Sequence, residues 1–272
     1  MTAAVPTLQV EQSLAVGRGP GRRIIVGVDE VGRGALAGPV AVGACAVEVV
    51  GGLAAPLPEG VRDSKKLTAR RREALVEPIL GSVLAGAVGW ASPAEIDEIG
   101  IMPALTTAAL RALDLLGVAA DAIVLDGDVD VLTPALTAPG RPTPLVHLQV
   151  SADRDCASVA AASILAKVAR DARMVELDAE APEYCWASNK GYGSRPHREA
   201  IDRFGVHAHH RRSWRLGSVP VARTAAPEPV PASATTALQG SVLPAAAPVP
   251  AAAEAGVLWG DDWYPQDGKE RR

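Results

Sequence analysis

Two adjacent carboxylates at the end of an apolar run are the feature that most limits what this chain can fold into. Residues 24–28 are apolar and mostly β-branched, which predicts a buried strand. Asp29 and Glu30 follow directly, and a Gly-Arg-Gly turn follows them at 32–34. Because neighbouring side chains of a strand point to opposite faces, this pair can flank one ion only if the backbone turns there. The pattern predicts a sheet whose edge carries acids beside a glycine turn.

From there to residue 177 the chain alternates between strand and helix patterns. Further strands are expected at 38–50, 85–90, 122–125 and 145–150. Helices are expected at 68–80, 103–116 and 156–177, the last with an alanine-rich face at 160–162 that allows close packing. Another helix begins at the capping box Ser92-Pro93-Ala94-Glu95, which has Pro at the first helical position. This alternation predicts an α/β sheet covered by helices.

Composition changes abruptly near Gly217. From 219 to about 256 the chain consists mainly of Ala, Pro, Val, Ser and Thr without hydrophobic periodicity, and it cannot bury enough apolar surface to offset chain entropy. We therefore expect a disordered Ala/Pro-rich tail at 217–272, a flexible leader at 1–22, and one folded unit over 23–216.

The composition does not fit a membrane or secreted protein. Gly, Pro or a charge interrupts every apolar run before 18 residues, so no membrane span is expected. The first residues lack the basic-then-apolar layout of a secretory signal. The three cysteines, Cys45, Cys156 and Cys185, are odd in number and widely spaced, which predicts small buried side chains in a reducing cytoplasm rather than disulfides or a metal site.

Basic residues are concentrated in two places, although the whole chain carries a net charge of −4. Seven Lys or Arg between Trp186 and Leu216 face only Glu199 and Asp202, and four of the five histidines lie there too. A second basic group is Lys65, Lys66, Arg70, Arg71 and Arg72. Such patches on a mildly acidic protein suit local contact with phosphates, although a solvated face would explain either patch alone.

Two further acids stand at positions comparable to the first pair. Asp126 ends the apolar run 122–125, and Asp153 lies just before the alanine-rich helix. Burying acids at strand or helix ends costs free energy unless cations neutralise them. If the four acids converge at one sheet edge, they suit two hard divalent ions, but their spacing along the chain leaves that convergence open.

A dinucleotide-binding turn is the competing interpretation of the first glycine motif. Its spacing here is Gly27-x-Asp29-x-x-Gly32, which puts a carboxylate where a pyrophosphate needs bare backbone. The chain also has no Gly-Lys-Ser/Thr phosphate loop. Neither of these two kinds of nucleotide binding is therefore expected.

Five separated motifs, in the same order, resemble those of the bacterial ribonuclease HII family over about residues 24–216. They are 29–34 (DEVGRG) with 37–40 (AGPV), 63–67 (DSKKL), 125–127 (LDG), 160–171 (AAASILAKVARD), and 191–194 (GYGS) with His197, His210-Arg211 and Ser213-Trp214. The resemblance implies a ribonuclease H-like α/β fold, in which helices flank a mixed sheet and a small helical part follows at the C-terminal end.

The resemblance also implies a metal-binding catalytic site. Its metal ligands and catalytic residues would be Asp29, Glu30, Asp126 and Asp153, binding two Mg²⁺ or Mn²⁺ ions. The chain departs from the family before the fourth acid, where Ser151-Ala152-Asp153 replaces the usual Lys-Gly-Asp and removes a positive charge. The acids interpreted as non-ligands are Asp128, Asp130 and Asp155.

Contacts to substrate follow from the same resemblance. The loop Gly32-Arg33-Gly34 resembles the family's sensor of the ribose 2′-hydroxyl, the one group that separates RNA from DNA at a nucleotide. Tyr192 resembles the tyrosine that packs on the neighbouring deoxyribose and so reads the RNA-to-DNA junction. The candidate phosphate contacts are Ser64, Lys65 and Lys66. The residues expected to serve helix packing and ion pairing are Lys167, Arg170 and Asp171.

The implied function is that of a cytoplasmic, monomeric endonuclease. It would hydrolyse the RNA strand of RNA–DNA hybrids and cut at ribonucleotides embedded in duplex DNA, leaving 5′-phosphate and 3′-hydroxyl ends by two-metal catalysis. A non-catalytic hybrid-binding protein would not need the acids, and a transposase or resolvase would not be expected to share both the 32–34 loop and Tyr192. In the tail, residues 239–243 faintly resemble a sliding-clamp-binding peptide, a pattern short enough to arise by chance.

Overall fold

A six-stranded mixed sheet forms the centre of the computed structural model, which describes residues 5–137 and 142–216. The strands are β1 (Arg22–Val31), β2 (Val40–Val50), β3 (Leu53–Ala54), β4 (Ala85–Ala91), β5 (Ala122–Asp126) and β6 (Leu145–Gln149). Their order is β3-β2-β1-β5-β6, and β4 pairs with β2 outside this path. β1 is antiparallel to β2 but parallel to β5, and β6 is parallel to β5.

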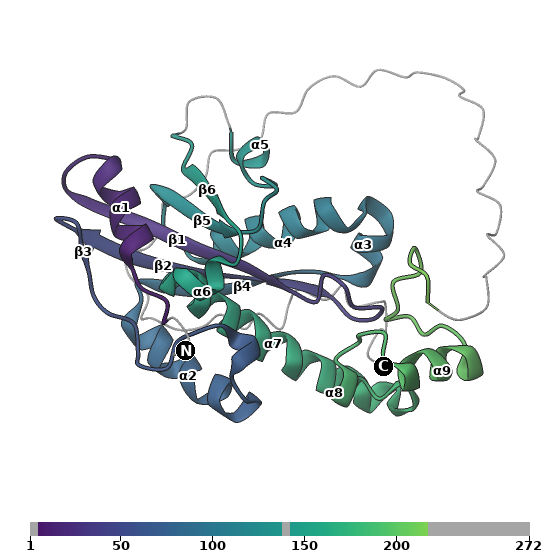
Figure 1. Ribbon diagram of the computed structural model, residues 1–272. Coiled ribbons are helices and arrows are strands. Elements are labelled where there is room, and N and C mark those ends of the chain that lie inside the picture. The colour runs from purple at the N-terminus through teal and green to yellow at the C-terminus, as the bar shows by residue number, and fades with distance from the viewer. Residues whose placement is uncertain (1–4, 138–141, 217–272) are drawn as a thin grey trace, which may run out of the picture.

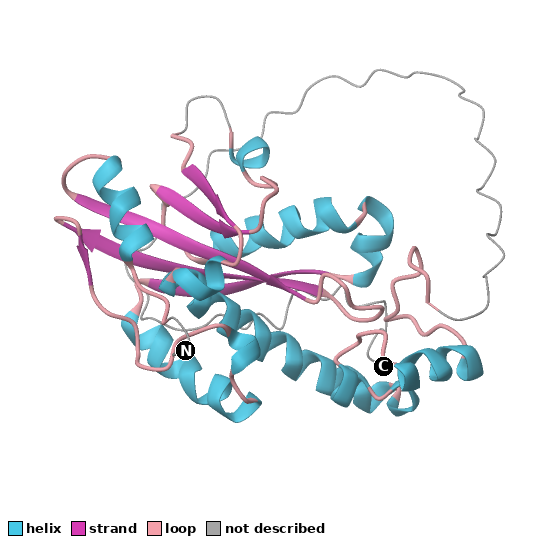
Figure 2. Ribbon diagram, in the orientation of Figure 1, coloured by secondary structure: helices cyan, strands magenta, loops and turns pink. Residues whose placement is uncertain are grey.

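Helices cover both faces of this sheet (Figure 1). The long helices are α2 (Ala69–Ser82), α4 (Ile101–Leu115) and α7 (Ala157–Glu180). The shorter ones are α1 (Gln9–Gly17), α3 (Pro93–Ile99), α5 (Thr133–Leu136), α6 (Ala152–Asp155), α8 (Trp186–Asn189) and α9 (Arg195–Phe204), with the 3₁₀ turns η1 (Ser64–Lys66) and η2 (Pro182–Tyr184). α7 packs on one face of β1 and β2 and α4 on the other, so both faces of the sheet are buried (Figure 2).

Glycines in β1 and β2 let α7 lie very close to the sheet. A Cβ at Gly27 would overlap the backbone of Ser158, and one at Gly43 would overlap the carbonyl of Ala162. On the helix side, the small-residue face expected at 160–162 is fully buried. The close approach holds α7 against β1, which carries Asp29 and Glu30, and against the neighbouring strand β2.

Most elements expected from hydrophobic periodicity are present within a few residues of their predicted ends. The capping box is confirmed, because the Ser92 Oγ accepts from the Glu95 N–H at 3.2 Å and the Glu95 carboxylate accepts from the Ser92 N–H at 2.8 Å. The expected mixed sheet flanked by helices is confirmed, as is the small C-terminal helical part, formed by α8 and α9. β3, α5 and α6 are too short to carry a periodicity that could predict them.

The N-terminal segment is folded from residue 5 on, so the expectation of a flexible leader over 1–22 is wrong for its described part. Thr7 pairs with Cys156 in a parallel bridge. Glu11 of α1 is fully buried, and its carboxylate accepts from the backbone N–H and the hydroxyl of Ser158 at 2.9 and 2.6 Å. α1 therefore caps the start of α7. A glutamate in a short polar segment suggests a surface position, which is why periodicity does not predict this contact.

Several expectations concern residues outside the described ranges. Residues 217–272, where the tail and the 239–243 peptide are expected, lie outside the described residues, as do 1–4 and 138–141. Within the described ranges, no helix is long and apolar enough to cross a bilayer. Cys45 and Cys156 are buried as expected, whereas Cys185 is exposed.

Removing the Glu11 carboxylate is expected to destabilise the fold. In Glu11→Ala two donors of Ser158 lose their acceptor inside the protein, which typically costs about 1–3 kcal/mol, whereas Glu11→Gln keeps an amide oxygen as acceptor and should be milder. Urea unfolding followed by circular dichroism measures the difference, with Ser13→Ala, an exposed change in the same helix, as control. If Glu11→Ala proves as stable as Ser13→Ala, α1 contributes nothing through this contact.

Candidate active site

Parallel strands bring three of the predicted acids to one edge of the sheet. The register pairs Val28 of β1 with Leu125 of β5, so the next residues, Asp29 and Asp126, leave neighbouring strands side by side. β6 lies parallel on the other side of β5 and leads into α6, which carries Asp153. Because parallel strands end at the same edge, the three carboxylates gather there.

Hydrogen bonding fixes Asp126 and leaves one oxygen of Asp153 without a partner. The Asp126 Oδ1 accepts from the backbone N–H of Ala152 at 2.7 Å, which ties the end of β5 to the start of α6. Asp153 is 3% exposed, and its Oδ2 has no hydrogen-bond partner. The Lys65 Nζ lies 3.6 Å from that oxygen, beyond hydrogen-bond distance. A buried carboxylate oxygen in this state is suited to bind a cation.

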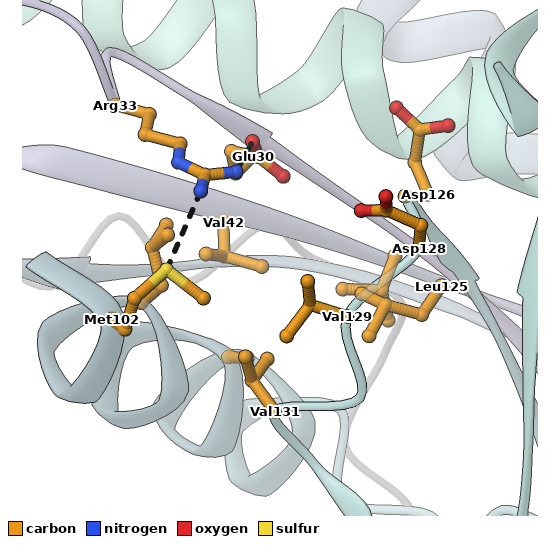
Figure 3. Close-up of a pocket in the computed structure, with 13 residues that line it drawn as sticks. Glu30, Arg33, Val42, Met102, Leu125, Asp126, Asp128, Val129 and Val131 are labelled. Carbon is orange, nitrogen blue, oxygen red and sulfur yellow. Dashed lines mark hydrogen bonds and ion pairs between the residues drawn. The ribbon is translucent and has the colours of Figure 1, made fainter. Parts of the chain in front are cut away.

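Glu30 reaches the site from the opposite face of the sheet. β1 stays extended to its last residue, and the first turn residue is Gly32, with φ +84°. The backbone therefore does not turn at the acid pair, and alternation sends Asp29 toward α7 and Glu30 toward α4. Glu30 lines a pocket together with Asp126, and its carboxylate lies 3.6 Å from the Arg33 guanidinium (Figure 3). The four acids thus approach one edge from both faces.

Burial and mutual repulsion disfavour the charged form of Asp29. Burial first, and then the charges of Asp126, Glu30 and Asp153, raise the pKa of Asp29 to about 7. A hydrogen bond from Ser163 opposes this shift. Asp29 is therefore the acid that feels the charges of all three others.

Burial also disfavours the charged forms of two further acids, Glu30 and Asp153. Burial raises the pKa of Glu30, which the Arg33 charge opposes and the Asp126 charge reinforces. Burial also raises the pKa of Asp153, with Lys65 opposing the shift and Asp126 adding to it. Neighbouring cations, Arg33 for Glu30 and Lys65 and Arg154 for Asp153, thus offset only part of the cost of burial.

The chemistry of this donor set fits divalent cations. Among the described residues no three His, Cys, Asp or Glu side chains lie close enough, as placed, to share one ion. All four donors are nevertheless carboxylates, which Mg²⁺ and Mn²⁺ prefer. The unpartnered oxygen of Asp153 and the raised pKa of Asp29 both mark negative charge that lacks sufficient compensation. A cation bound there would remove both costs.

Neutralising Asp29 is expected to stabilise the metal-free protein at alkaline pH. Folding raises the pKa of Asp29 from 3.8 to about 7, so ionisation of this carboxyl lowers the free energy of unfolding. This loss of stability is absent below the unfolded pKa, grows as the pH rises between the two pKa values, and is complete above the folded pKa. Asp29→Asn should therefore melt at a higher temperature than wild type at about pH 8, and the gain should vanish near about pH 4. Thermal unfolding in a chelator measures this, with Asp128→Asn, in an exposed loop, as control. An alkaline loss of stability in Asp29→Asn would contradict the assignment.

Arg211 holds the loop at 32–34 through backbone carbonyls. Its buried guanidinium donates to the carbonyls of Gly32, Arg33 and Gly38 at 2.7, 2.8 and 3.1 Å. Burial, and then the charge of a neighbouring arginine, lower the pKa of Arg211 to about 9. Three charge-assisted bonds from one planar group restrict the loop to one conformation.

Arg170 braces the same loop from α7. It is buried and donates to the carbonyls of Pro39, Lys190 and Ala37 at 2.9, 2.9 and 3.3 Å. A Cβ at Gly32 would overlap its guanidinium, so only glycine fits there. The expectation that Arg170 serves ion pairing does not fit the structure, because its donors are used by backbone carbonyls.

Tyr192 lies beside this braced loop. The N–H groups of Leu36 and Ala37 donate to the Gly191 carbonyl at 2.8 and 3.2 Å, which joins the tyrosine segment to the residues that follow the loop. The Tyr192 ring is 38% exposed, and its centroid lies 5.5 Å from the Arg170 guanidinium carbon. An exposed aromatic ring is thus held in place next to the 32–34 loop.

Ser64 is buried, so its predicted phosphate contact does not fit the structure. Its Oγ lies 2.9 Å from the Ser163 Oγ, and Ser163 in turn hydrogen-bonds Asp29. Ser64 is only 3% exposed, and it contacts the serine that hydrogen-bonds Asp29 instead of facing solvent. The side chains of Lys65 and Lys66 are 77% and 48% exposed and stay candidates for phosphates.

The other acids considered in the sequence, Asp128, Asp130 and Asp155, are exposed. Asp128 lines the same pocket as Glu30 and Asp126, so its interpretation as a non-ligand stays a prediction. The Lys167 Nζ lies 2.7 Å from the Asp171 carboxylate, which confirms the expected ion pair.

Sequence reasoning assigned no supporting role to Ser163 or Arg211. Ser163 lies in the motif at 160–171 and Arg211 in the motif at 210–211, and this placement is the sequence signal that could have identified them as functional residues. A serine in an alanine-rich helix indicates packing, however, and an arginine in a basic segment indicates phosphate contact. Their actual partners lie far away along the chain.

Comparison with known proteins places this site in a family. The family model for ribonuclease HII matches residues 26–216. The chain belongs to the ribonuclease HII family. Ribonuclease HII from Streptomyces griseus subsp. griseus is 48% identical over 213 residues, which cover 77% of this chain and 84% of that protein. Ribonuclease HII from Shewanella amazonensis is 40% identical over 213 residues, covering 78% and 95%.

Solved ribonuclease HII structures share the fold. Ribonuclease H2 from Pyrococcus horikoshii OT3 superimposes with a TM-score of 0.56 at 27% identity, covering 71% of this chain and 94% of that one. The ribonuclease HII in a PCNA:RNase HII complex from Archaeoglobus fulgidus gives 0.54 at 27%, covering 70% and 93%. The expected ribonuclease H-like fold is confirmed. As a ribonuclease HII, the chain is a ribonuclease H enzyme, a hydrolase that acts on RNA–DNA hybrids.

Proposed function

We propose that the enzyme cuts at single ribonucleotides embedded in duplex DNA as well as within the RNA strand of hybrids, leaving 5′-phosphate and 3′-hydroxyl ends. The observation that carries this proposal is the juxtaposition of the acids at the ends of β1 and β5 and in α6 with two recognition elements. These are the braced loop at 32–34 and the exposed ring of Tyr192. The acids supply hydrolysis, and the loop and ring can distinguish a ribose from a deoxyribose that follows it.

The four acids are proposed to hold two divalent cations, Mg²⁺ or Mn²⁺. The proposed ligands are Asp29, Glu30, Asp126 and Asp153. Bound there, such ions activate the attacking water and stabilise the leaving 3′ oxygen. The protein's own contribution is to keep the carboxylates in place, through the Ala152 N–H on Asp126 and through Ser163 on Asp29. Because Asp29 feels the charges of the other three acids, its ionised form would gain from a cation held by any of them.

The loop at 32–34 is proposed to meet the ribose 2′-hydroxyl through its backbone. A Cβ at Gly34 would contact nothing within 4 Å, so the loop is open on that side and a sugar can approach closely. Arg211 removes the loop's freedom to move, which favours a fixed position for its polar groups. Arg33, half-exposed, pairs with Glu30 and so links the loop to a proposed metal ligand.

The proposed partners are RNA–DNA hybrids and duplex DNA that contains ribonucleotides, bound by a monomer in the cytoplasm. Lys65 and Lys66 are suited to phosphates because their ammonium groups extend from η1 beside the acids. The ribonuclease HII from Archaeoglobus fulgidus was solved in complex with PCNA. For this chain, a clamp contact through 239–243 stays a prediction.

Asp29→Asn or Asp126→Asn is expected to abolish cleavage while leaving hybrid binding largely intact. Each change removes a ligand charge, whereas the basic residues that contact phosphates remain. The measurement is cleavage of a labelled duplex with one ribonucleotide, in Mn²⁺ and in Mg²⁺, beside a gel-shift assay on the same duplex. Substantial turnover by either variant in Mg²⁺ would contradict the two-metal assignment. If the wild-type enzyme leaves the one-ribonucleotide duplex uncut, the proposed substrate is wrong.

Tyr192→Ala is expected to slow cleavage at a single embedded ribonucleotide by about ten- to a hundredfold, because an aromatic ring stacked on a sugar contributes on the order of 1–3 kcal/mol by analogy with base stacking. Tyr192→Phe should be much milder, since the ring rather than the hydroxyl makes the contact. Initial rates of the three proteins on a one-ribonucleotide duplex give the answer. Equal rates would leave junction recognition to the 32–34 loop alone.

A further inference from the structure

Four of the chain's five histidines gather around one buried tryptophan. They are His197 in α9 and His207, His209 and His210 in the segment after it, with Trp186 of α8 at the centre. Their ring centroids lie between 5.4 and 6.3 Å from that of Trp186. None of them belongs to the acidic site, so the proposed chemistry gives this histidine cluster no role.

Every ring nitrogen of His197 and His210 is engaged within the protein. The His197 Nε2 lies 3.0 Å from the Trp186 Nε1 and 3.1 Å from the His210 Nε2. The His197 Nδ1 lies 2.9 Å from the Tyr192 carbonyl oxygen. The His210 Nδ1 accepts from the backbone N–H of His207 at 2.9 Å. No nitrogen of the pair is left to bind a metal, so the pair is a hydrogen-bonded unit and not a metal centre.

These partners determine where the protons of both rings lie. The Trp186 indole can only donate, so the His197 Nε2 accepts, and the His197 proton must be on Nδ1. That N–H then donates to the Tyr192 carbonyl. The backbone N–H of His207 can only donate, so the His210 Nδ1 accepts and its proton is on Nε2, facing His197. Both rings are therefore neutral, and the single lone pair of the His197 Nε2 is shared by the N–H groups of Trp186 and His210.

The backbone at His209 and His210 contacts the segment that follows the 32–34 loop. Ala37 forms an antiparallel bridge with His210, and the Gly38 N–H donates to the His209 carbonyl at 2.8 Å. From the tyrosine side, the Gly191 carbonyl accepts from the Ala37 N–H at 3.2 Å. Residues 36–38 thus contact Gly191, next to Tyr192, on one side and His209 and His210 on the other. The hydrogen bond between His197 and His210 links these two sides.

We propose that His197 is a positioning residue that fixes Tyr192 relative to the 32–34 loop, with His210 as its anchor. The His197 Nδ1–H holds the backbone of Tyr192, and His210 ties that ring to the strand-like contact at Ala37. A fixed position of the Tyr192 ring relative to the 32–34 loop favours cleavage at a ribonucleotide that is followed by a deoxyribonucleotide over cleavage within a continuous RNA strand. The pair therefore sets junction specificity. This inference rests on the proposed role of Tyr192 at the junction.

The surroundings of the pair keep it neutral. Burial, and then the neighbouring His197, lower the pKa of His210 to about 4. Burial also lowers the pKa of His197, and the Arg198 charge adds to this shift. The titratable groups around the pair are Arg198, His207, His209 and Tyr184, with Glu180 bonded to His209. Near neutral pH the bonding pattern described above is therefore the stable one.

Two isosteric changes at His197 separate its contact with Tyr192 from its role in the core. In His197→Asn the amide nitrogen takes the place of Nδ1 and can still donate to the Tyr192 carbonyl, while the bond toward His210 is lost. In His197→Gln the amide reaches the place of Nε2 and keeps the distal partners, while the donor to Tyr192 is lost. His207→Gln is the matched control, because it removes a ring of the same cluster that does not bond Tyr192.

The measurement is kcat/KM on a duplex with one ribonucleotide and on a continuous RNA–DNA hybrid, together with the melting temperature of each protein. His197→Gln should lower the ratio of the first rate constant to the second by about two- to tenfold, the effect of one hydrogen bond. His197→Asn and His207→Gln should keep the wild-type ratio. In a Tyr192→Ala background, His197→Gln should not change the ratio further, because the residue it positions is gone.

Each contrary result has a separate meaning. If Tyr192→Ala lowers the ratio but His197→Gln does not, the inference fails and the proposed function stands. If the Asn and Gln changes lower both rate constants alike, in step with melting temperature, His197 is a core residue only. If Tyr192→Ala leaves the ratio unchanged, the proposed role of Tyr192 fails and takes the inference with it.

A spectroscopic measurement keeps the inference testable even where a variant does not fold. Long-range ¹⁵N–¹H correlation of the wild-type protein near neutral pH should assign the Nδ1–H tautomer to His197 and the Nε2–H tautomer to His210. In Tyr192→Ala, which keeps the backbone carbonyl, both tautomers should persist. A His197 protonated on Nε2, or on both nitrogens, would overturn the positioning role.

Discussion

Close packing of α7 on β1 and β2 is the constraint on which the rest of this structure depends. Because Gly27 and Gly43 place no side chain between helix and sheet, residues along α7 meet β1 and the loop after it directly. Ser163 reaches Asp29, and Arg170, about two turns further along, braces the 32–34 loop. One helix thereby supports the acids and the recognition loop together, so a shift of α7 would disturb both.

The acids work against the stability of the fold. Carboxylates at the ends of parallel strands share a poorly solvated edge, where burial and like charge raise the pKa of Asp29 to about 7. Ser151, two residues before Asp153, carries no charge, but Lys65 lies 3.6 Å from that acid and supplies a cation from a different element. This conflict is the one expected where local stability is given up for binding, and it fits the proposed metal and phosphate contacts.

The segments proposed to recognise the substrate are held differently, by buried donors that hydrogen-bond to backbone carbonyls. Arg211 comes from the C-terminal part of the described chain and donates to Gly32, 179 residues earlier. The histidine pair extends the same principle to Tyr192, with neutral rings whose protons are determined by their partners. Loops built this way keep their shape without strands or helices of their own, which suits the proposed discrimination of one hydroxyl group.

The sequence by itself determined the alternation of strands and helices, the capping box at Ser92, and the candidate acids, because periodicity and motif order are local properties. Only the tertiary structure decided that the backbone stays extended at Asp29 and Glu30, that Ser64 is buried against Ser163, and that residues 9–17 form a helix docked on the start of α7. These outcomes depend on which distant groups meet. The hydrogen bonds that bury Ser64 and Glu11 join residues 99 and 147 positions apart. Contacts of this kind leave no periodic pattern in the chain, so only the folded structure reveals them.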